Sequence, residues 1–149
     1  MSSPYVRTTI KQFIDDNSSE SVVDLTALSE EIKEMLADYG IQPDAPWLGI
    51  QFIGDDEVPI ALAATNVLGK YRESGAIYFH VVETARLGCG DIMLTRGEAL
   101  RNLLRGRRIG DIIVDSVTPM NFDNGATLQF EGGYMSGSFL ISYRRDLDL

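Results

Sequence analysis

The residue pair best suited to nucleophilic chemistry is Cys89 with His80, because the chain contains one cysteine and one histidine. A cysteine nucleophile needs a neighbouring base that lowers the pKa of its thiol. His80 lies in the apolar run FHVV, which is typical of a half-buried strand, and Cys89 stands at the start of a predicted helix. We therefore interpret both as packing residues and expect no enzyme and no catalytic residue. A Cys89–His80 dyad is the alternative.

The turn Gly88-Cys89-Gly90 precedes a helical pattern, as phosphate-binding loops do. Met93 stands where the third glycine of a dinucleotide-binding fingerprint would be, and no lysine follows. The glycines therefore indicate a tight turn, and we expect no cofactor.

Asp55, Asp56 and Glu57 form the densest run of carboxylates and could in principle contact a hard cation. Such a cation needs several oxygen ligands that converge in space, and adjacent residues in a loop rarely converge. A single cysteine and a single histidine are also too few for a cysteine-rich zinc site. The sequence therefore predicts no metal site.

Charge is distributed unevenly along the chain. Residues 1–60 carry three basic and twelve acidic residues, a net charge of −9, whereas residues 61–149 carry ten of each. Such an acidic surface repels phosphates, so we expect no sequence-specific binding of nucleic acid. An acidic surface would let DNA slide past without binding to it. The same charge could instead serve only to keep the protein soluble.

Four arginines close together are the one concentrated positive feature of the chain. They could be a solvated helix end, stabilised by the helix dipole. Arginine also pairs bidentately with carboxylates, so the alternative is an interface with the acidic front half of a neighbouring subunit. The interface hypothesis pairs Arg101, Arg105, Arg107 and Arg108 with Glu30, Glu31 and Glu34.

Length and composition bound the architecture. A chain of 149 residues with 44% hydrophobic and 23% charged residues is typical of one globular domain, with no stretch apolar enough for a membrane helix. The N-terminus lacks the pattern of a secretory signal, so we expect synthesis in the cytoplasm. We expect one domain over 1–149, with a helical part over 1–45 and the sheet and third helix over 46–149.

Apolar residues at helical spacing predict three helices. The first follows Ser3 and Pro4 and ends near Asn17, after which the polar DNSSES is a linker. The second covers 25–39, with Gly40 as its C-terminal cap. The third lies within 88–110, where Gly97 weakens but does not end it.

Four strands are predicted from β-branched and aromatic runs, at 47–53, 75–84, 111–118 and about 134–144. The first two should pair antiparallel, and 128–131 could add a short strand. Between the first two we expect a long excursion over 54–74 that is mobile until partners bind it. This flexible assembly loop would carry Asp55, Asp56, Glu57, Lys70 and Arg72.

The predicted order is therefore α-α-β-β-α-β-β. Neighbouring strands that pair, with helices segregated from them, indicate an α+β domain. We expect one antiparallel or mixed sheet of about four strands, covered by helices on one face.

Residues 46–149 resemble the tail terminator-like (tail completion) proteins of long-tailed bacteriophages. The segments that carry the resemblance are PWLGIQFIGDD, YRESGAIYFHVVE, the Gly88-Cys89-Gly90 turn, RGEALRNLLRGRRIGDIIVDSV and EGGYMSGSFLISYRRDL. The resemblance rests on the order of strands and helix, and it includes no catalytic signature.

This resemblance implies a virion structural protein, assembled in the host cytoplasm. Its subunits would form a homo-oligomeric ring, typically a hexamer, at the head-proximal end of the tail tube. The ring would end tube growth, contact the tail tube protein and the head-completion or connector protein, and let DNA pass through its lumen. Two alternatives stay open: a connector subunit of the neck, and a small-molecule binding protein or enzyme that uses the Cys89 region.

Overall fold

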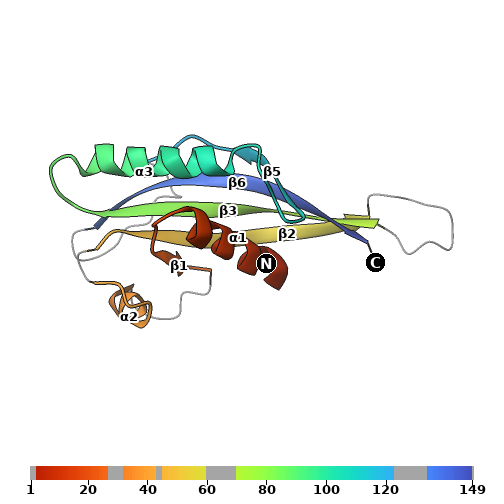
Figure 1. Cartoon of the computed structure of the whole chain (residues 1–149), viewed down its shortest axis with the longest axis horizontal. Helices are drawn as coiled ribbons and strands as arrows, with labels where there is room; N and C mark the ends of the chain where they lie inside the picture. The colour runs from red at the N-terminus through yellow and green to blue at the C-terminus, as the bar shows by residue number, and fades with distance from the viewer. Residues whose placement is uncertain (1–2, 27–31, 43–44, 60–69, 123–133, 149) are drawn as a thin grey trace.

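The computed structural model describes residues 3–26, 32–42, 45–59, 70–122 and 134–148 (Figure 1). Within these ranges the chain forms three helices and one curled sheet of six strands, so its class is α+β. The strand order is β1-β2-β3-β6-β5-β4; β1 is parallel to β2, and the other neighbours are antiparallel. Along the chain the elements are α1 (Pro4–Asn17), β1 (Val22–Asp24), α2 (Ile32–Asp38), β2 (Trp47–Pro59), β3 (Lys70–Thr84), α3 (Cys89–Leu104), β4 (Arg108–Ile109), β5 (Ile112–Val117) and β6 (Tyr134–Asp148).

Helix α1 begins and ends where the sequence predicts. The hydroxyl of Ser3 accepts a hydrogen bond from the backbone N–H of Val6, and Pro4 occupies the first turn. Val6, Ile10 and Ile14 recur at helical spacing and are fully buried. The helix is therefore held by one apolar face.

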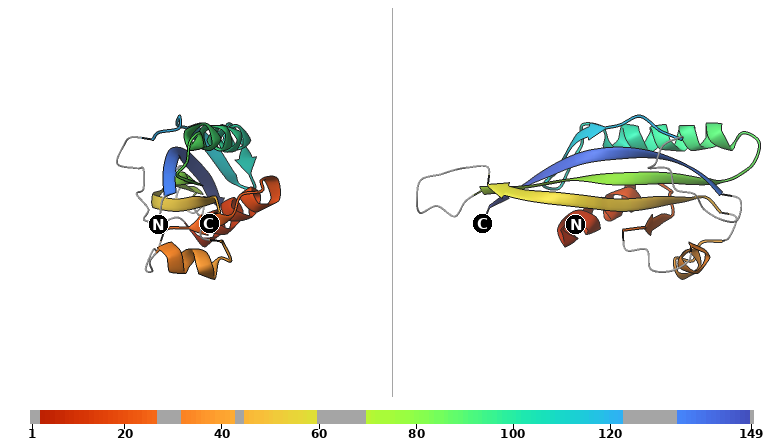
Figure 2. Two further views of the ribbon diagram at one scale, coloured as in Figure 1. Left: turned by 90° about the vertical axis from the view of Figure 1, so that its left-hand side faces the viewer. Right: turned by 180° about the vertical axis from the view of Figure 1, so that it is seen from behind.

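The main core lies between one face of the sheet and the helices α1 and α3 (Figures 1 and 2). The central strands supply its aromatic centre, where the rings of Phe79 and Phe139 stack at 5.0 Å. Helix α3 adds a continuous apolar face to this core. Its buried members are Cys89, Met93, Gly97, Leu100 and Leu104.

The opposite face of the sheet carries a second apolar cluster, under α2. Trp47 and Val82 point to this face and are fully buried against Leu36 and Val23. The prediction that helices cover one face only was wrong, because the run WLGIQFI is apolar on both sides of its strand. Figure 2 shows α2 on the side of the sheet away from α3.

The predicted second helix over 25–39 was also wrong at its start. Leu25 and Thr26 are not helical, and the N–H of Leu25 donates to the carbonyl of Ile50 at 2.8 Å. Val22–Asp24, between the predicted linker and the predicted helix, forms β1 beside Leu48–Ile50. Within the described residues α2 begins at Ile32, and Gly40 ends it with a φ of 71°, as predicted for the C-terminal cap.

The described parts of the predicted excursion over 54–74, namely 54–59 and 70–74, are strand. β2 continues to Pro59 and β3 starts at Lys70, with a register shift between Ile53 and Asp55; the connection at 60–69 lies outside the described residues. With β6 these strands run on past the helices as a three-stranded arm (Figure 1). Gly54 and Pro59 locally favour the end of a strand. The pairing of β2 with β3, which is itself paired with β6, outweighs that preference.

The C-terminal third contains one strand more than predicted. Helix α3 stops at Leu104, and the residues after it form the short hairpin β4–β5, which Gly106 and Gly110 permit through φ values of 62° and 60°. β6 extends to Asp148, four residues beyond the predicted end. The possible strand at 128–131 lies outside the described residues.

Candidate functional site

Three of the four clustered arginines form an exposed basic surface at the C-terminal end of α3. Arg105, Arg107 and Arg108 are exposed, and they donate in turn to Asn102 Oδ1, the carbonyl of Leu103 and the carbonyl of Gly110. The guanidinium of Arg107 also lies over the ring of Phe13, 5.7 Å from its centroid. None of the three is paired with a carboxylate in the part of the chain that the structure describes. We call these three residues the basic surface.

Arg101 is not part of that surface. The residue is 9% exposed, and its guanidinium donates to the carbonyl of Thr118 at 2.7 Å and to Glu98 at 2.5 Å. These bonds attach α3 to the segment after β5. The spacing of the arginines could not distinguish Arg101 from the others, because its burial depends on the path of a segment seventeen residues later.

The predicted acidic partners fall on or near α2. Glu34 is exposed on this helix, and Asp38, one turn later, is exposed beside it. Glu30 and Glu31 lie outside the described residues. Neither Glu34 nor Asp38 contacts a cation in the described ranges, and we call these two residues the acidic surface.

The basic and acidic surfaces lie on opposite sides of the sheet. Helix α3 covers the main core, whereas α2 covers the second cluster. In Figure 1, α2 is below the sheet at one end, and the last turn of α3 is above the sheet and closer to the arm. A subunit with complementary surfaces on opposite sides can bind copies of itself head to tail.

The expected loop residues are found in the three-stranded arm instead. The backbone of Asp55, Asp56 and Glu57 pairs with β3, and the backbone of Lys70 lies opposite that of Asp148 in the β3–β6 register. Arg72 donates to the carboxylate of Asp146 at 2.8 and 3.2 Å. These residues therefore stand on regular strands, and whether they take part in assembly stays a prediction.

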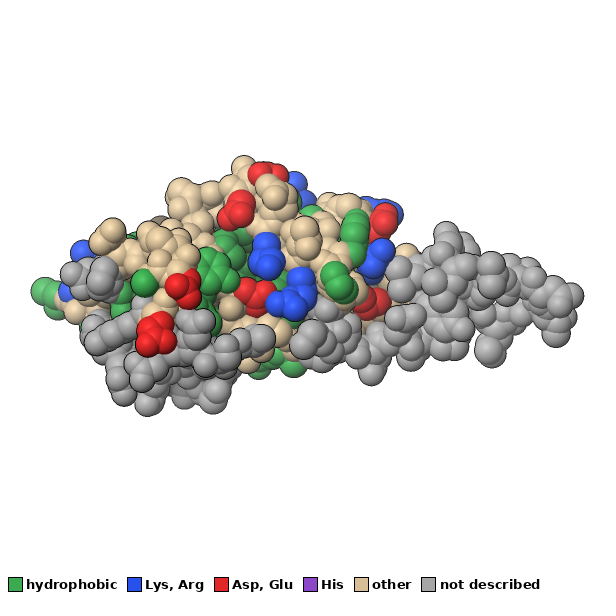
Figure 3. Space-filling model, turned by 90° about the horizontal axis from the view of Figure 1, so that it is seen from below, with side chains coloured by type: hydrophobic (Ala, Val, Ile, Leu, Met, Phe, Trp, Pro, Cys, Tyr) green, Lys and Arg blue, Asp and Glu red, His purple; other side chains and the backbone are tan. Residues whose placement is uncertain are grey.

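Basic residues of the front half are matched within the chain. Arg7 and Lys11 of α1 contact the carboxylate of Asp24 at 2.7 and 3.4 Å. Burial alone would raise the pKa of Asp24, but hydrogen bonds from Arg7 and Thr26 outweigh it and lower that pKa below its ordinary value. The face seen from below shows basic and acidic side chains intermingled (Figure 3).

A buried ion network around Arg96 was missed from the sequence. Its guanidinium contacts both carboxylate oxygens of Glu20, Glu83 Oε2 at 3.1 Å, and the carbonyls of Val82 and Trp47. Glu83 is only 3% exposed. Arg96 thereby ties α3 to the ends of two strands and to the segment after α1. One signal could have indicated it: Arg96 lies three residues after Met93 and four before Leu100, next to the apolar face of its helix.

Cys89 and His80 are not brought together. Cys89 lies in the main core, with its sulfur 3.5 Å from that of Met135, whereas His80 lies on the other face of β3, 3.2 Å from Gln51. Burial lowers the pKa of His80 to about 4, so its ring is neutral at pH 7. The two side chains therefore cannot exchange a proton directly.

Among the described residues, no three His, Cys, Asp or Glu side chains gather where they could hold a metal ion, and no helix there is long and apolar enough to span a membrane. Comparison with protein-family models and with curated proteins found no match to the chain.

Proposed function

We propose that this chain is a structural subunit of a long-tailed bacteriophage that assembles as a ring at the head-proximal end of the tail tube. The observation that supports it best is the pair of oppositely charged surfaces on opposite sides of the sheet. A closed ring requires one surface of each subunit to meet a different surface of the next. The resemblance of residues 46–149 to tail terminator-like proteins supplies the place in the particle.

In this proposal the basic surface of one subunit contacts the acidic surface of its neighbour. Arginine forks can bind carboxylates bidentately, and an interface removes part of the water that would otherwise screen the pair. Arg105 and Arg108 would make the main contacts. Glu34 and Asp38, with Glu30 and Glu31 next to them in the sequence, would supply the carboxylates.

A charge-swap experiment tests this contact. Arg105→Glu with Arg108→Glu should abolish ring formation, measured by light scattering at low and at high salt. Adding Glu34→Lys and Asp38→Lys should restore it, because the pairs are re-formed with opposite signs. Asp91→Lys, exposed in the first turn of α3 at the end opposite the basic surface, reverses a charge outside both surfaces and is the control.

Rings that form normally with both arginines reversed would refute the interface. Loss of rings without rescue would show that the two surfaces do not meet each other.

Imaging of particles that lack the protein tests the place of the ring. A terminator subunit predicts overlong or unattached tails, because tube growth no longer stops. The second candidate, a connector subunit of the neck, predicts filled heads that leak DNA beside free tails of normal length. The charge-complementary surfaces suit either ring, so this comparison separates the two candidates.

A further inference from the structure

Two aromatic residues of α1 contact the basic surface or the turn that carries it. Phe13 contacts Arg107 directly, because the guanidinium lies over its ring. Tyr5, near the other end of the helix, accepts a hydrogen bond through its hydroxyl from the backbone N–H of Asp111 at 3.3 Å. Asp111 lies in the turn between β4 and β5, so α1 contacts both the residues after α3 and the hairpin that follows them.

The turn held by Tyr5 also supports Arg108. The Nε–H of Arg108 donates to the carbonyl of Gly110 at 3.2 Å. Gly110 has a φ of 60°, and a Cβ added to it would lie 2.6 Å from the Tyr5 hydroxyl, so glycine permits this close contact. The ring of Tyr5 is itself covered by the guanidinium of Arg145 in β6, 3.9 Å from its centroid. Arg108 is therefore joined to the sheet through Gly110 and Tyr5.

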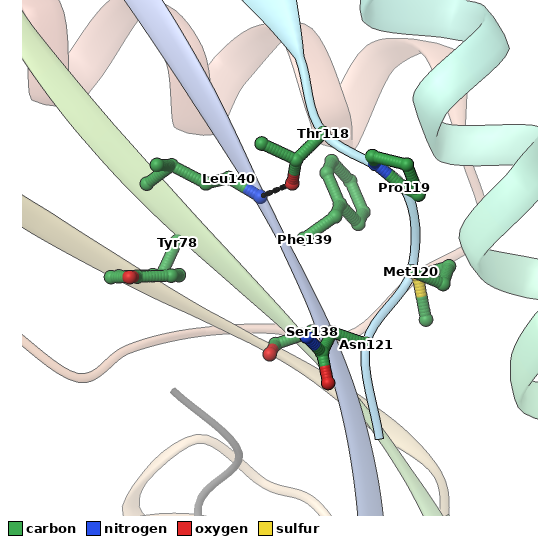
Figure 4. A pocket seen from close by; sticks show the side chains of 8 residues that line it. All are labelled: Tyr78, Thr118, Pro119, Met120, Asn121, Ser138, Phe139 and Leu140. Atoms are coloured by element: carbon green, nitrogen blue, oxygen red, sulfur yellow. Dashed lines mark hydrogen bonds between the residues drawn. The ribbon is translucent and has the colours of Figure 1, made fainter. Parts of the chain in front are cut away.

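The end of α3 that carries Arg105 is held by a different set of contacts. Arg101, one turn earlier, donates to the carbonyl of Thr118 at 2.7 Å. The hydroxyl of Thr118 accepts from the backbone N–H of Leu140 in β6 at 2.8 Å (Figure 4). Arg105 itself donates to Asn102 Oδ1 at 3.0 Å. All three arginines of the basic surface therefore extend from backbone that is attached to the rest of the domain.

These contacts hold the arginines without neutralising their charge. The hydrogen-bond acceptors are two carbonyls and one side-chain amide oxygen. Arg107 and Arg108 donate through Nε, and in the described part of the chain their terminal amino groups make no hydrogen bond. Those amino groups can bind both oxygens of a carboxylate. A guanidinium that is already held in place also loses less conformational entropy when it binds.

We infer that Tyr5 and Phe13 are positioning residues of the assembly interface. They hold Arg108 and Arg107 in the orientation in which the two guanidinium groups meet carboxylates of a neighbouring subunit. The aromatic rings act through the arginines and need not touch the neighbour themselves. This inference rests on the proposed ring, and it adds α1 to the elements that determine how subunits bind each other.

Phe13→Leu tests the contact with Arg107, because leucine keeps an apolar side chain but removes the ring. Loss of a cation–π contact at an exposed site predicts about two- to fivefold weaker association per interface, measured by sedimentation. Phe13→Tyr keeps the ring and should associate as the wild type does. In an Arg107→Ala background, Phe13→Leu should have no further effect, because the arginine through which it acts is absent.

Tyr5→Phe tests the turn in the same way. It removes the hydroxyl that accepts from Asp111 and keeps the ring that Arg145 covers. Loss of one hydrogen bond predicts about two- to tenfold weaker association, and no further loss in an Arg108→Ala background. Phe122→Leu is the control, since this 36% exposed ring lies against Gly137 of β6, outside the basic surface. It should leave association unchanged.

A second measurement needs no ring and therefore separates this inference from the proposed function. At high salt, where charge-paired subunits separate, nuclear magnetic resonance of the full chain reports the order of each arginine Nε–H. Phe13→Leu should lower the order at Arg107 and leave that at Arg105 unchanged. Rings that survive reversal of Arg105 and Arg108 refute the proposed interface, whatever the order at Arg107. An unchanged order at Arg107 in Phe13→Leu, or equal weakening of association with and without Arg107, would overturn the inference.

Discussion

Replacing Arg96 should destabilise the fold more than replacing any exposed arginine. Arg96→Met keeps most of the apolar stem but removes the guanidinium that faces Glu20 and Glu83. Glu83 is 3% exposed, so the substitution leaves a buried carboxylate whose remaining ion pair is with the exposed Arg86, at 3.5 Å. Breaking a buried ion pair in this way typically costs about 3–5 kcal/mol.

Urea unfolding followed by circular dichroism measures this change. With a slope of about 2 kcal/mol per molar urea, the midpoint should fall by roughly 1.5–2.5 M. Arg105→Met, on the same helix but exposed, is the matched control and should change stability by no more than about 0.5 kcal/mol. Adding Glu83→Gln to Arg96→Met should recover part of the loss, since the buried charge is gone.

A loss below about 1 kcal/mol in Arg96→Met, or one no larger than in Arg105→Met, would refute this reasoning. It would mean that the network behaves as a solvated surface pair. Failure of Glu83→Gln to recover any stability would show that the buried Glu83 carboxylate is not the source of the loss.

Two further predictions concern stability. Burial lowers the pKa of His80 to about 4 in the folded protein, so the His80 ring is protonated first in the unfolded chain as pH falls. The free energy of unfolding should therefore drop between pH 6.5 and 4, by up to ~3 kcal/mol from this residue. This pH-dependent drop should be smaller in His80→Gln than in the wild type, and an equal drop in the two proteins would contradict the prediction. Gly88→Ala should destabilise by about 1 kcal/mol, because φ is +83° there, whereas Gly90→Ala, in open space within α3, should stabilise by about 0.5–1 kcal/mol; equal unfolding temperatures would contradict this.

Elements that are set by residues close to one another in the sequence were predicted correctly. Ser3 and Pro4 start α1, Gly40 ends α2, and the strand pair 47–53 with 75–84 is antiparallel as expected. The class, α+β, also followed from the order of helical and strand patterns.

Elements that depend on distant partners could not be predicted in the same way. β1 exists because Val22–Asp24 meets β2 in parallel, a pairing that no local pattern encodes. The arm extends through Gly54 and Pro59 because β3 and β6 are long enough to pair with it. The sequence analysis predicted no strand at 22–24 and a mobile excursion in place of the arm, as expected when tertiary contacts override propensity.

In the candidate site, too, features set by neighbouring residues could be predicted and features set by distant segments could not. The charge cluster at the end of α3 is visible in the sequence, but the burial of Arg101 and the network of Arg96 are set by segments far away in the chain.

Cryo-electron microscopy of the head–tail junction of the assembled virion tests the central claim most directly. We predict a ring of this chain between the last ring of the tail tube and the head connector, with Arg105 and Arg108 of each subunit against α2 of the next. A junction without this chain, or a ring in which these arginines face solvent, would contradict the account.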